Sequence, residues 1–335
     1  MQALQQYNRA MITRLNLILI AITLLLLATA TSARDLSSEP ITPILPANDL
    51  SQAKIRLGKT LFNDPRLSHD NSISCASCHD LSAGGADKGP LSFGVNGTPG
   101  TTNTPTVYNT RLNFVQFWNG RAANLHEQIN GPVRNPVEMN STWPEVIDRL
   151  QQDNRLKQNF AALYSDGLTA NNIRDAIAEF ERSLMTLNAP FDRWLKGDES
   201  ALSVEQKQGY RLFKSYGCIS CHQGQNVGGN MFAFFGAVND ISEYFKARGT
   251  PLSEADLGRF SETNNPDDRY LFKVPSLRLA SRTAPYFHDG SVNDLAAAIK
   301  IMGRFQLGRE IPEQHIASIS AFIRSLAGDH PELAE

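Results

Sequence analysis

The chain has 335 residues, and its 32 Lys or Arg and 34 Asp or Glu give a formal charge of −2. This length supports two domains of ordinary size, each able to bury a core. The nearly balanced charge, without a basic stripe, argues against a nucleic-acid-binding protein.

The first 33 residues carry the features of a secretory signal peptide. They contain Arg9 and Arg14 but no acidic residue, and an apolar run at 15–28 precedes small residues that end at Ala33. This order predicts cleavage near Ala33, because the apolar core is short for a membrane span. An uncleaved N-terminal membrane anchor is the alternative interpretation. In either case the rest of the chain lies outside the cytoplasm, and we expect it in the periplasm.

All four cysteines belong to two copies of a Cys-x-x-Cys-His motif, which are Cys75, Cys78 and His79 in the first copy and Cys218, Cys221 and His222 in the second. Two thiols at this spacing can add to the vinyl groups of one haem, and the histidine that follows then binds the iron. A structural zinc site would need four ligands close together, whereas these pairs lie 143 residues apart (75 to 218). A thioredoxin-type redox pair needs a βαβ setting, which neither copy has. The motifs therefore predict two covalently bound haem c groups.

Two glycine-rich segments follow the haem motifs. Residues 83–105 carry six glycines and three prolines, which excludes regular secondary structure. We expect a long shaped loop beside the first haem, and ordered loops of this kind are more often functional than idle. Residues 224–236 are interpreted as a similar loop beside the second haem, where Met231 and three phenylalanines can pack against the porphyrin.

Two short patterns occur twice in the chain. Gly-x-x-Leu-Phe precedes each haem motif, at 58–62 and 209–213, and Ile-x-x-Phe-x-Arg-Ser-Leu recurs at 177–184 and 319–326. The second pattern has the period of a helix with one apolar face. The repeat predicts an all-α fold of two cytochrome c-like haem domains with long irregular loops. We assign an N-terminal haem domain to 34–190 and a C-terminal haem domain to 191–335, divided just past the first closing helix.

Five longer motifs occur in a characteristic order. They are Asp-Pro-Arg-Leu-Ser (64–68), Thr-Pro-Thr-Val-Tyr-Asn (104–109), Gln-Phe-Trp-Asn-Gly-Arg (116–121), Asn-Pro-Val-Glu-Met (135–139) and Ala-Pro-Tyr-Phe-His-Asp-Gly (284–290). In sequence and in order they resemble the motifs of bacterial di-haem cytochrome c peroxidases. The resemblance extends from about residue 57 to residue 328, which argues against chance agreement.

The resemblance implies an exported peroxidase that is a homodimer. In that family the N-terminal haem reacts with hydrogen peroxide, and the C-terminal haem receives electrons from a small donor protein, which is a cytochrome c or a cupredoxin. By resemblance, Glu138 and Gln128 are catalytic residues on the open face of the first haem, and Trp118 lies between the haems. A carboxylate there can take a proton from one peroxide oxygen and return it to the other. Gln128 can donate and accept hydrogen bonds without adding charge.

Two further ligand sets follow from the resemblance. Met302 occupies the position of the sixth ligand of the second haem iron, where a thioether raises the potential; Met231 is the rival. Related di-haem oxygenases that modify protein tryptophans have a tyrosine at this position, so Met302 argues against that reaction. The family also binds one calcium ion between its modules. The matching positions are Asn103, Thr283 and Pro285, and their oxygen ligands suit Ca²⁺.

The first haem is expected to be open to peroxide. In family members that must be half-reduced before they react, a loop histidine sixteen residues after the proximal histidine caps the iron. Here that position is Val95, and no histidine occurs between His79 and His126. Because valine has no lone pair to offer, we expect the fully oxidised protein to bind peroxide. The alternative function is a di-haem electron carrier, in which Met139 or another side chain closes the first haem as well.

Overall fold

The computed structural model describes residues 39–334, so the predicted signal peptide at 1–33 lies outside the described residues. Within 39–334 the fold is mostly helical, and none of these helices is long and apolar enough to cross a membrane. The α-helices and strands are α2 (Gln52–Phe62), α3 (Cys75–Cys78), α4 (Leu125–Gln128), α5 (Asn130–Arg134), α6 (Trp143–Leu150), α7 (Asn154–Leu163), α8 (Ala170–Ser183), α9 (Pro190–Leu195), α10 (Val204–Tyr216), β1 (Phe232–Phe234), α11 (Ser242–Arg248), α12 (Phe260–Thr263), β2 (Leu271–Lys273), α13 (Leu295–Leu307) and α14 (Glu313–Arg324). Short 3-10 helices interrupt the loops, and those used below are η4 (Val95–Gly97) and η6 (Cys218–Ser220).

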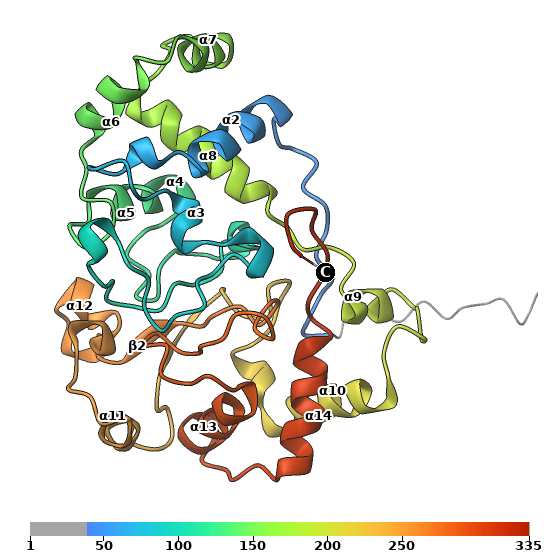
Figure 1. Ribbon diagram of the computed structural model, residues 1–335. Coiled ribbons are helices and arrows are strands. Elements are labelled where there is room, and N and C mark those ends of the chain that lie inside the picture. Colours follow the sequence, from blue (N-terminus) through green and yellow to red (C-terminus); the bar gives the residue numbers. More distant parts are fainter. Residues whose placement is uncertain (1–38, 335) are drawn as a thin grey trace, which may run out of the picture.

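Two pairs of helices form the framework of the fold. Helix α2 packs against α8, and α10 packs against α14. In Figure 1 the first pair lies in the upper part of the molecule and the second pair in the lower part. Helices α2 and α10 contain the patterns at 58–62 and 209–213, and α8 and α14 contain all but the last one or two residues of those at 177–184 and 319–326. The predicted opening and closing helices are therefore confirmed.

A glycine lies where the two helices of each pair cross. A Cβ atom on Gly58 would stand 1.9 Å from the carbonyl oxygen of Ala176, and one on Gly209 would stand 1.9 Å from that of Ser318. Any side chain at these positions would push the helices apart, whereas glycine allows the two backbones to touch. The glycine of the repeated Gly-x-x-Leu-Phe pattern is therefore a helix-crossing residue.

Each helix pair carries its own apolar core. Phe62 of α2 meets Phe180 of α8 with ring centroids 5.3 Å apart, and Phe213 of α10 meets Phe322 of α14 with centroids 5.1 Å apart. The buried residues around the two contacts form separate clusters. The division of the chain into two domains at residue 190 stays a prediction. The two separate cores are compatible with it.

The fold class needs one correction, because the described part of the chain contains a small sheet. Strand β1 pairs with β2 in antiparallel register, with Phe232 opposite Lys273 and Phe234 opposite Leu271. The segment 224–236 is thus not wholly a loop. Its short aromatic run has no helical period of its own, and it satisfies its backbone groups by pairing with a second short run about forty residues later in the chain.

The first described residues pack with the C-terminal half of the chain. Asp192 and Arg278 are fully buried and form an ion pair of 2.7 Å. The second oxygen of Asp192 accepts a hydrogen bond from the amide of Ile44, and Arg278 also donates to the carbonyls of Thr42 and Gln225. Each charge is therefore fully engaged, as buried ions require.

The C-terminal tail returns to the N-terminal half. The amide of Ala334 donates to the carbonyl of Ser82, and Lys59 of α2 forms an ion pair with Glu332. Figure 1 shows the tail leaving the end of α14 and passing beside the segment that leads into α2. Both ends of the described chain thus cross to the other half and join the two halves.

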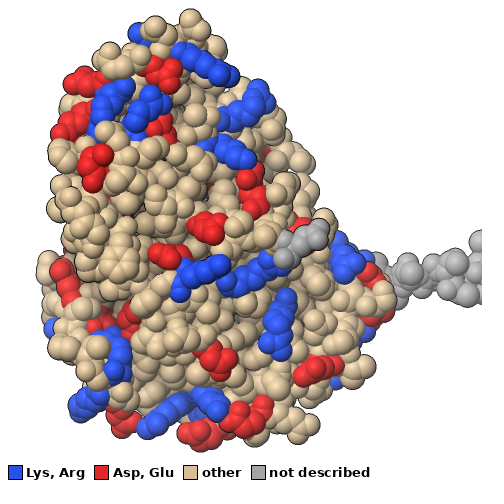
Figure 2. Space-filling view, in the orientation of Figure 1, with Lys and Arg blue, Asp and Glu red and all other residues tan. Residues whose placement is uncertain are grey.

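The loop at 83–105 contains neither an α-helix nor a strand, as predicted. Isolated bridges between Asp80 and Ala86 and between Phe93 and Pro99 give it a fixed shape. Charged groups are interspersed over the face shown in Figure 2, and neither sign forms a continuous patch there. That surface agrees with the absence of a basic stripe in the sequence.

The crossing at Gly58 gives a prediction with a definite sign. Helix propensity alone would make Gly58→Ala stabilising by about 1 kcal/mol. We expect it instead to lower the free energy of unfolding by about 1–3 kcal/mol, the range for overpacking. Urea unfolding of the holo-protein measures this, and Arg56→Ala on the exposed face of α2 should change stability by less than about 0.5 kcal/mol. A stabilised Gly58→Ala variant would show that α2 and α8 do not touch at this point.

Candidate functional site

Both Cys-x-x-Cys-His motifs adopt one tight turn. The amide of His79 donates to the carbonyl of Cys75, and the amide of His222 donates to that of Cys218, each at 3.0 Å. The turn is helix α3 in the first motif and η6 in the second. None of the four cysteines forms a disulfide. One turn of backbone therefore presents two thiols and an imidazole together, the arrangement that covalent haem attachment requires.

Each motif histidine has one ring nitrogen fixed by the backbone. Nδ1 of His79 lies 3.1 Å from the carbonyl oxygen of Gly85, and Nδ1 of His222 lies 3.3 Å from that of Val227. A carbonyl oxygen can only accept a hydrogen bond, so Nδ1 carries the proton and Nε2 keeps its lone pair. Burial lowers the pKa of both imidazoles, that of His222 to about 4. Both rings are thus neutral near pH 7, as iron ligands must be.

The repeated phenylalanine supports each motif histidine. The ring centroids of Phe62 and His79 are 6.4 Å apart, and those of Phe213 and His222 are also 6.4 Å apart. The Gly-x-x-Leu-Phe pattern therefore serves two purposes. Its glycine allows the helix crossing, and its phenylalanine, one turn later, packs beside the iron-binding histidine.

The second motif opens into a partly open, mostly apolar cavity. The cavity has a volume of about 530 Å³ and is lined by Cys218, Cys221, His222 and Met302 together with many apolar side chains. Its size falls within the range of roughly 300–1,000 Å³ that encloses a cofactor-sized ligand. Met231, the rival iron ligand, is not among the lining residues. Two thiols, one neutral imidazole, a thioether and an apolar wall fit a haem.

Burial also acts on the thiols. It raises the pKa of all four cysteines, that of Cys218 to about 11. Zinc is bound by thiolates, and thiols with raised pKa values resist losing their protons. Neutral sulfur, as in a thioether to haem, suits these positions better than a thiolate–metal bond does.

Glu138 lies in the turn that follows α5. One of its carboxylate oxygens accepts a hydrogen bond of 2.6 Å from the side chain of Asn135. Burial raises the pKa of Glu138, and the opposing effects of Asn135 and the nearby Arg121 only partly compensate. A carboxyl group with a raised pKa can exchange a proton closer to neutral pH than an ordinary glutamate can.

The glycine-rich loop packs directly on the turn that carries Glu138. The amide of Val95 donates to the carbonyl of Glu138 at 2.8 Å, and a Cβ on Gly94 would stand 2.4 Å from the same carbonyl oxygen. The side chain of Val95 is buried. By resemblance, Val95 occupies the position of the capping histidine. This position is held against the Glu138 turn, and its side chain here is aliphatic.

Gln128 is the last residue of helix α4, and the side chain of His126 in the same helix contacts α8. The ring of His126 lies 3.3 Å from the carbonyl of Asn171 at the start of α8. Met139, which the alternative function would use as a ligand, is 2% exposed and belongs to the core of the N-terminal half. The structure thus gives both His126 and Met139 packing roles.

Phe117 and Arg121 explain part of the Gln-Phe-Trp-Asn-Gly-Arg motif. The guanidinium of Arg121 lies 3.4 Å from the centroid of the Phe117 ring, a cation–π contact. On its other side the ring fits against Gly131, where a Cβ would stand 2.7 Å from it. Arg121 is thereby placed in the electrostatic range of Glu138.

Trp118 lies at the junction of the two halves. It lines the cavity of the second motif and also a large open cleft, which Arg121 and Asn135 line as well. Its indole Nε1 donates to the carbonyl of Asn103 at 2.8 Å, and its own carbonyl accepts from the amide of Lys273 at 2.9 Å. One hydrogen bond therefore fixes the indole and the other fixes the backbone that carries it.

The three predicted calcium residues come together at the same cavity. Asn103, Thr283 and Pro285 all line it. The Nδ2 of Asn103 donates to the carbonyls of Gly89 and Pro90, both at 3.2 Å, so its Oδ1 is directed away from these contacts. That oxygen has no hydrogen-bond donor within residues 39–334, which fits a side chain that offers oxygen to a hard cation.

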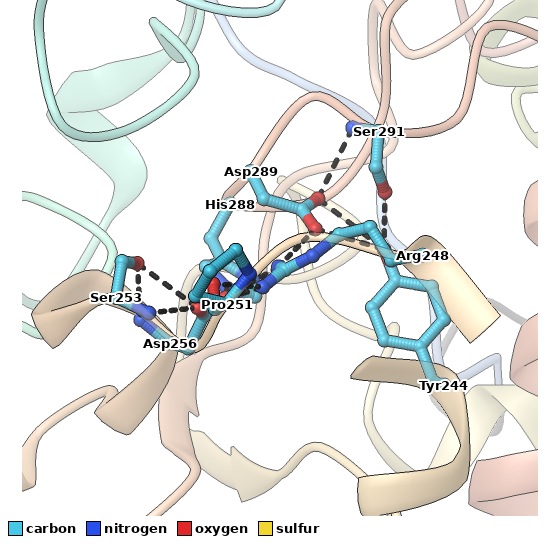
Figure 3. A network of polar contacts seen from close by, with 8 residues as sticks. All are labelled: Tyr244, Arg248, Pro251, Ser253, Asp256, His288, Asp289 and Ser291. Atoms are coloured by element: carbon cyan, nitrogen blue, oxygen red, sulfur yellow. Dashed lines mark hydrogen bonds and ion pairs between the residues drawn. The ribbon is translucent and has the colours of Figure 1, made fainter. Parts of the chain in front are cut away.

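A buried charge network was not foreseen from the sequence (Figure 3). It lies beside Trp118, whose ring centroid is 6.5 Å from that of His288. Nε2 of His288 lies 2.8 Å from Asp256, and Arg248 forms ion pairs of 2.7 Å with both Asp256 and Asp289. Burial alone would raise the pKa of Asp256, but the hydrogen bonds from Arg248, His288 and Ser253 outweigh it and hold the pKa well below its usual range. Because the guanidinium of Arg248 occupies the space between the carboxylates, this cluster is a structural ion-pair network.

A backbone hydrogen bond connects this ion-pair network to the junction between the two halves. The carbonyl of His288 accepts a hydrogen bond of 2.7 Å from the amide of Asn103, whose own carbonyl holds Trp118. The His288 ring stacks on Phe272 with centroids 4.6 Å apart. His288 thus positions the loop that carries Asn103. Its place in the Ala-Pro-Tyr-Phe-His-Asp-Gly motif was the sequence signal, but its partner Asp256 lies in a region without a motif.

Comparison with known proteins adds three findings. Residues 52–200 match the family model described as di-haem cytochrome c peroxidase. The chain is 46% identical over 292 residues to the cytochrome c peroxidase Ccp of Escherichia coli K12, an alignment that covers 87% of this chain but only 62% of that protein. It is 43% identical over 301 residues to the cytochrome c551 peroxidase of Nitrosomonas europaea, with 88% of this chain and 86% of that protein covered.

A solved structure shares the fold. The crystal structure of a MauG-like protein associated with microbial copper homeostasis superposes with a TM-score of 0.74 at 26% sequence identity. The superposition covers 90% of this chain and 98% of that one. The similarity therefore extends over nearly the whole fold.

Proposed function

Because this chain belongs to the di-haem cytochrome c peroxidase family, we propose that it reduces hydrogen peroxide to water with electrons from a small redox protein, a cytochrome c or a cupredoxin. The observation that carries the proposal is the difference between two sites built on one motif. The second site encloses a thioether, Met302, in the same cavity as His222. The first site has a carboxylate with a raised pKa, Glu138, and a valine where a capping histidine would stand.

The organisation of the protein follows the same proposal. It comprises an N-terminal peroxidatic haem domain at 34–190 and a C-terminal electron-transfer haem domain at 191–335. The signal peptide at 1–33 directs it to the periplasm, where two chains associate as a homodimer. The two separate apolar cores support the division into domains, and the composition of the first 33 residues supports export.

Glu138 moves the protons of the reaction. A haem held by Cys75, Cys78 and His79 would supply the iron at which the O–O bond is cleaved. H₂O₂ with two electrons and two protons gives two waters. For heterolytic cleavage of the O–O bond, the leaving oxygen departs as water only if it gains the proton that the other oxygen carries. Glu138 takes the proton from the first oxygen and returns it to the leaving oxygen. Gln128 orients the substrate with an uncharged amide.

Trp118 and the calcium ligands act at the junction. Trp118 relays electrons between the sites, which is supported by its position on both the cavity and the cleft. One calcium ion is held by the side chain of Asn103 and by the carbonyls of Thr283 and Pro285, and the accepting oxygen of Asn103 supports this assignment. The alternative function, an electron carrier closed by Met139, has less support because Met139 is a core residue.

Replacement of the proposed acid–base residue tests the function. Glu138→Gln should lower peroxidase turnover by about 10²-fold or more, the usual scale for a lost acid–base group, while both haem spectra stay unchanged. Steady-state assays against a panel of reduced donor proteins measure this. Glu205→Gln removes an exposed carboxylate of α10 and should keep full activity.

The pH profile gives a second signature of Glu138. Burial raises its pKa, so the carboxylate form is lost at a higher pH than for an ordinary glutamate of pKa about 4.3. Wild-type activity should therefore fall as the pH drops through this raised pKa, and that limb should vanish in Glu138→Gln. A wild-type profile without such a limb, or full activity in the variant, removes Glu138 from the mechanism.

Met302 can be tested through the potential of the second haem. Met302→His should lower that potential and slow electron entry, because imidazole donates more strongly to ferric iron than a thioether does. Met231→Leu is the matched control and should leave the potential unchanged, since Met231 does not line the cavity. Spectroelectrochemical titration separates the two assignments, and a potential that changes only in the Met231 variant would reverse them.

Val95 predicts a reaction without prior reduction. It is buried, its amide is bound to the Glu138 carbonyl, and its side chain offers no lone pair. Rapid mixing of the all-ferric protein with one equivalent of H₂O₂ should therefore change the spectrum at once. No spectral change, together with a bis-histidine low-spin signal from the first haem, would contradict this expectation.

A further inference from the structure

Lys273 is a buried lysine without a partner. Its side chain is 7% exposed, and its ammonium group makes no hydrogen bond or ion pair with any residue in the described range 39–334. Burial is the one cause that acts on its pKa, which falls to about 8. An unpaired buried ammonium is costly, and proteins almost always provide such a charge with a counter-charge.

The cavity that Lys273 lines contains no such counter-charge. Lys273 borders the same cavity as His222, Met302 and the two cysteines of the second motif. Among the described residues that line it, Lys273 is the only Lys, Arg, Asp or Glu. A mostly apolar cavity with one positive charge and no acidic residue suits an occupant that brings its own anion.

The backbone fixes where this charge lies. Lys273 ends strand β2, opposite Phe232 of β1, and its amide donates to the carbonyl of Trp118 at 2.9 Å. The lysine is therefore anchored at the side of the cavity that faces the junction between the two sites. The neighbouring Phe272 is stacked on His288, which limits movement of the strand.

We propose that Lys273 forms an ion pair with a propionate carboxylate of the haem bound by Cys218, Cys221 and His222. The inference rests on the proposed function only in that a haem occupies this cavity. A haem carries two propionate groups, so it supplies the anion that the cavity lacks. The pair would keep the lysine charged and would cancel a negative charge near the iron. Less negative charge favours the ferrous state, so Lys273 acts with Met302 to raise the potential.

The test is the potential of the second haem in the full holo-protein. Lys273→Met keeps the length of the side chain and removes its charge, and it should lower the potential of the methionine-ligated haem. We expect at least a tenfold shift of the equilibrium toward ferric iron, which is 59 mV for a one-electron couple. Lys273→Arg keeps the charge and should titrate close to the wild type. Lys246→Met, which removes an exposed charge from α11, is the matched control and should leave the potential unchanged.

A second readout separates charge pairing from a structural role. Resonance Raman bands of the propionate groups report their hydrogen bonding, and they should shift in Lys273→Met but not in Lys273→Arg or Lys246→Met. If the methionine variant fails to incorporate haem, Lys273→Gln takes its place in both measurements. A potential and propionate bands equal to the wild type in the neutral variant would overturn the proposal. Equal shifts in the arginine and neutral variants would overturn it too.

Failure of this inference can be told apart from failure of the proposed function. Wild-type protein that contains a methionine-ligated haem but lacks peroxidase activity would remove the function and leave the Lys273 experiment intact. Active wild-type protein with an unchanged potential in Lys273→Met would remove the ion pair and leave the function intact.

Discussion

The two sites depend on a contact between helix backbones. Gly58 touches the carbonyl of Ala176 and Gly209 touches that of Ser318, at distances that leave no room for a Cβ. Four residues later on each opening helix, a phenylalanine packs beside the motif histidine with the same centroid distance of 6.4 Å in both halves. The helix crossing thus fixes the aromatic support, the support fixes the imidazole, and a backbone carbonyl selects its tautomer. A small shift at the crossing would be transmitted to the iron ligand, since packed interiors leave little slack.

The two halves share a framework of paired helices, but their sites differ because the segments between the helices differ. In the N-terminal half, the loop at 83–105 folds onto the Glu138 turn, where the amide of a valine donates to the backbone carbonyl of Glu138. In the C-terminal half, helix α13 brings Met302 to the cavity wall. Reaction with a small oxidant requires an open coordination position, whereas electron transfer requires a closed one. The repeated helices account for what the sites share, and the chain between them accounts for how they differ.

The features that could be predicted from the sequence are those that depend on residues close together in the chain. The Cys-x-x-Cys-His motifs, the helical period of the closing segments and the glycine content of 83–105 each depend on neighbouring residues, and the structure agrees with them. The sequence could not predict pairings between distant segments. Strands β1 and β2 are three residues each and lie far apart in sequence, and the ion pair of Asp192 with Arg278 joins residues 86 positions apart. Lys273 gave a weak signal, a lysine within an apolar run, but its lack of a partner is visible only in three dimensions.

In the proposed mechanism the junction between the sites carries electrons but not protons. Trp118 donates its indole proton to the carbonyl of Asn103, and a carbonyl is not a base that can remove that proton. Asn103 is held in turn by the backbone of His288, whose ring is bound to Asp256 within the ion-pair network of Arg248. Within residues 39–334 the indole donates its hydrogen bond to a carbonyl and not to a base, so under the proposed relay an electron can pass Trp118 while the indole keeps its proton. Glu138, whose raised pKa suits proton exchange, lies on the side of the first site. The proposed proton transfer is thereby confined to the first site, and the second site needs only to deliver electrons.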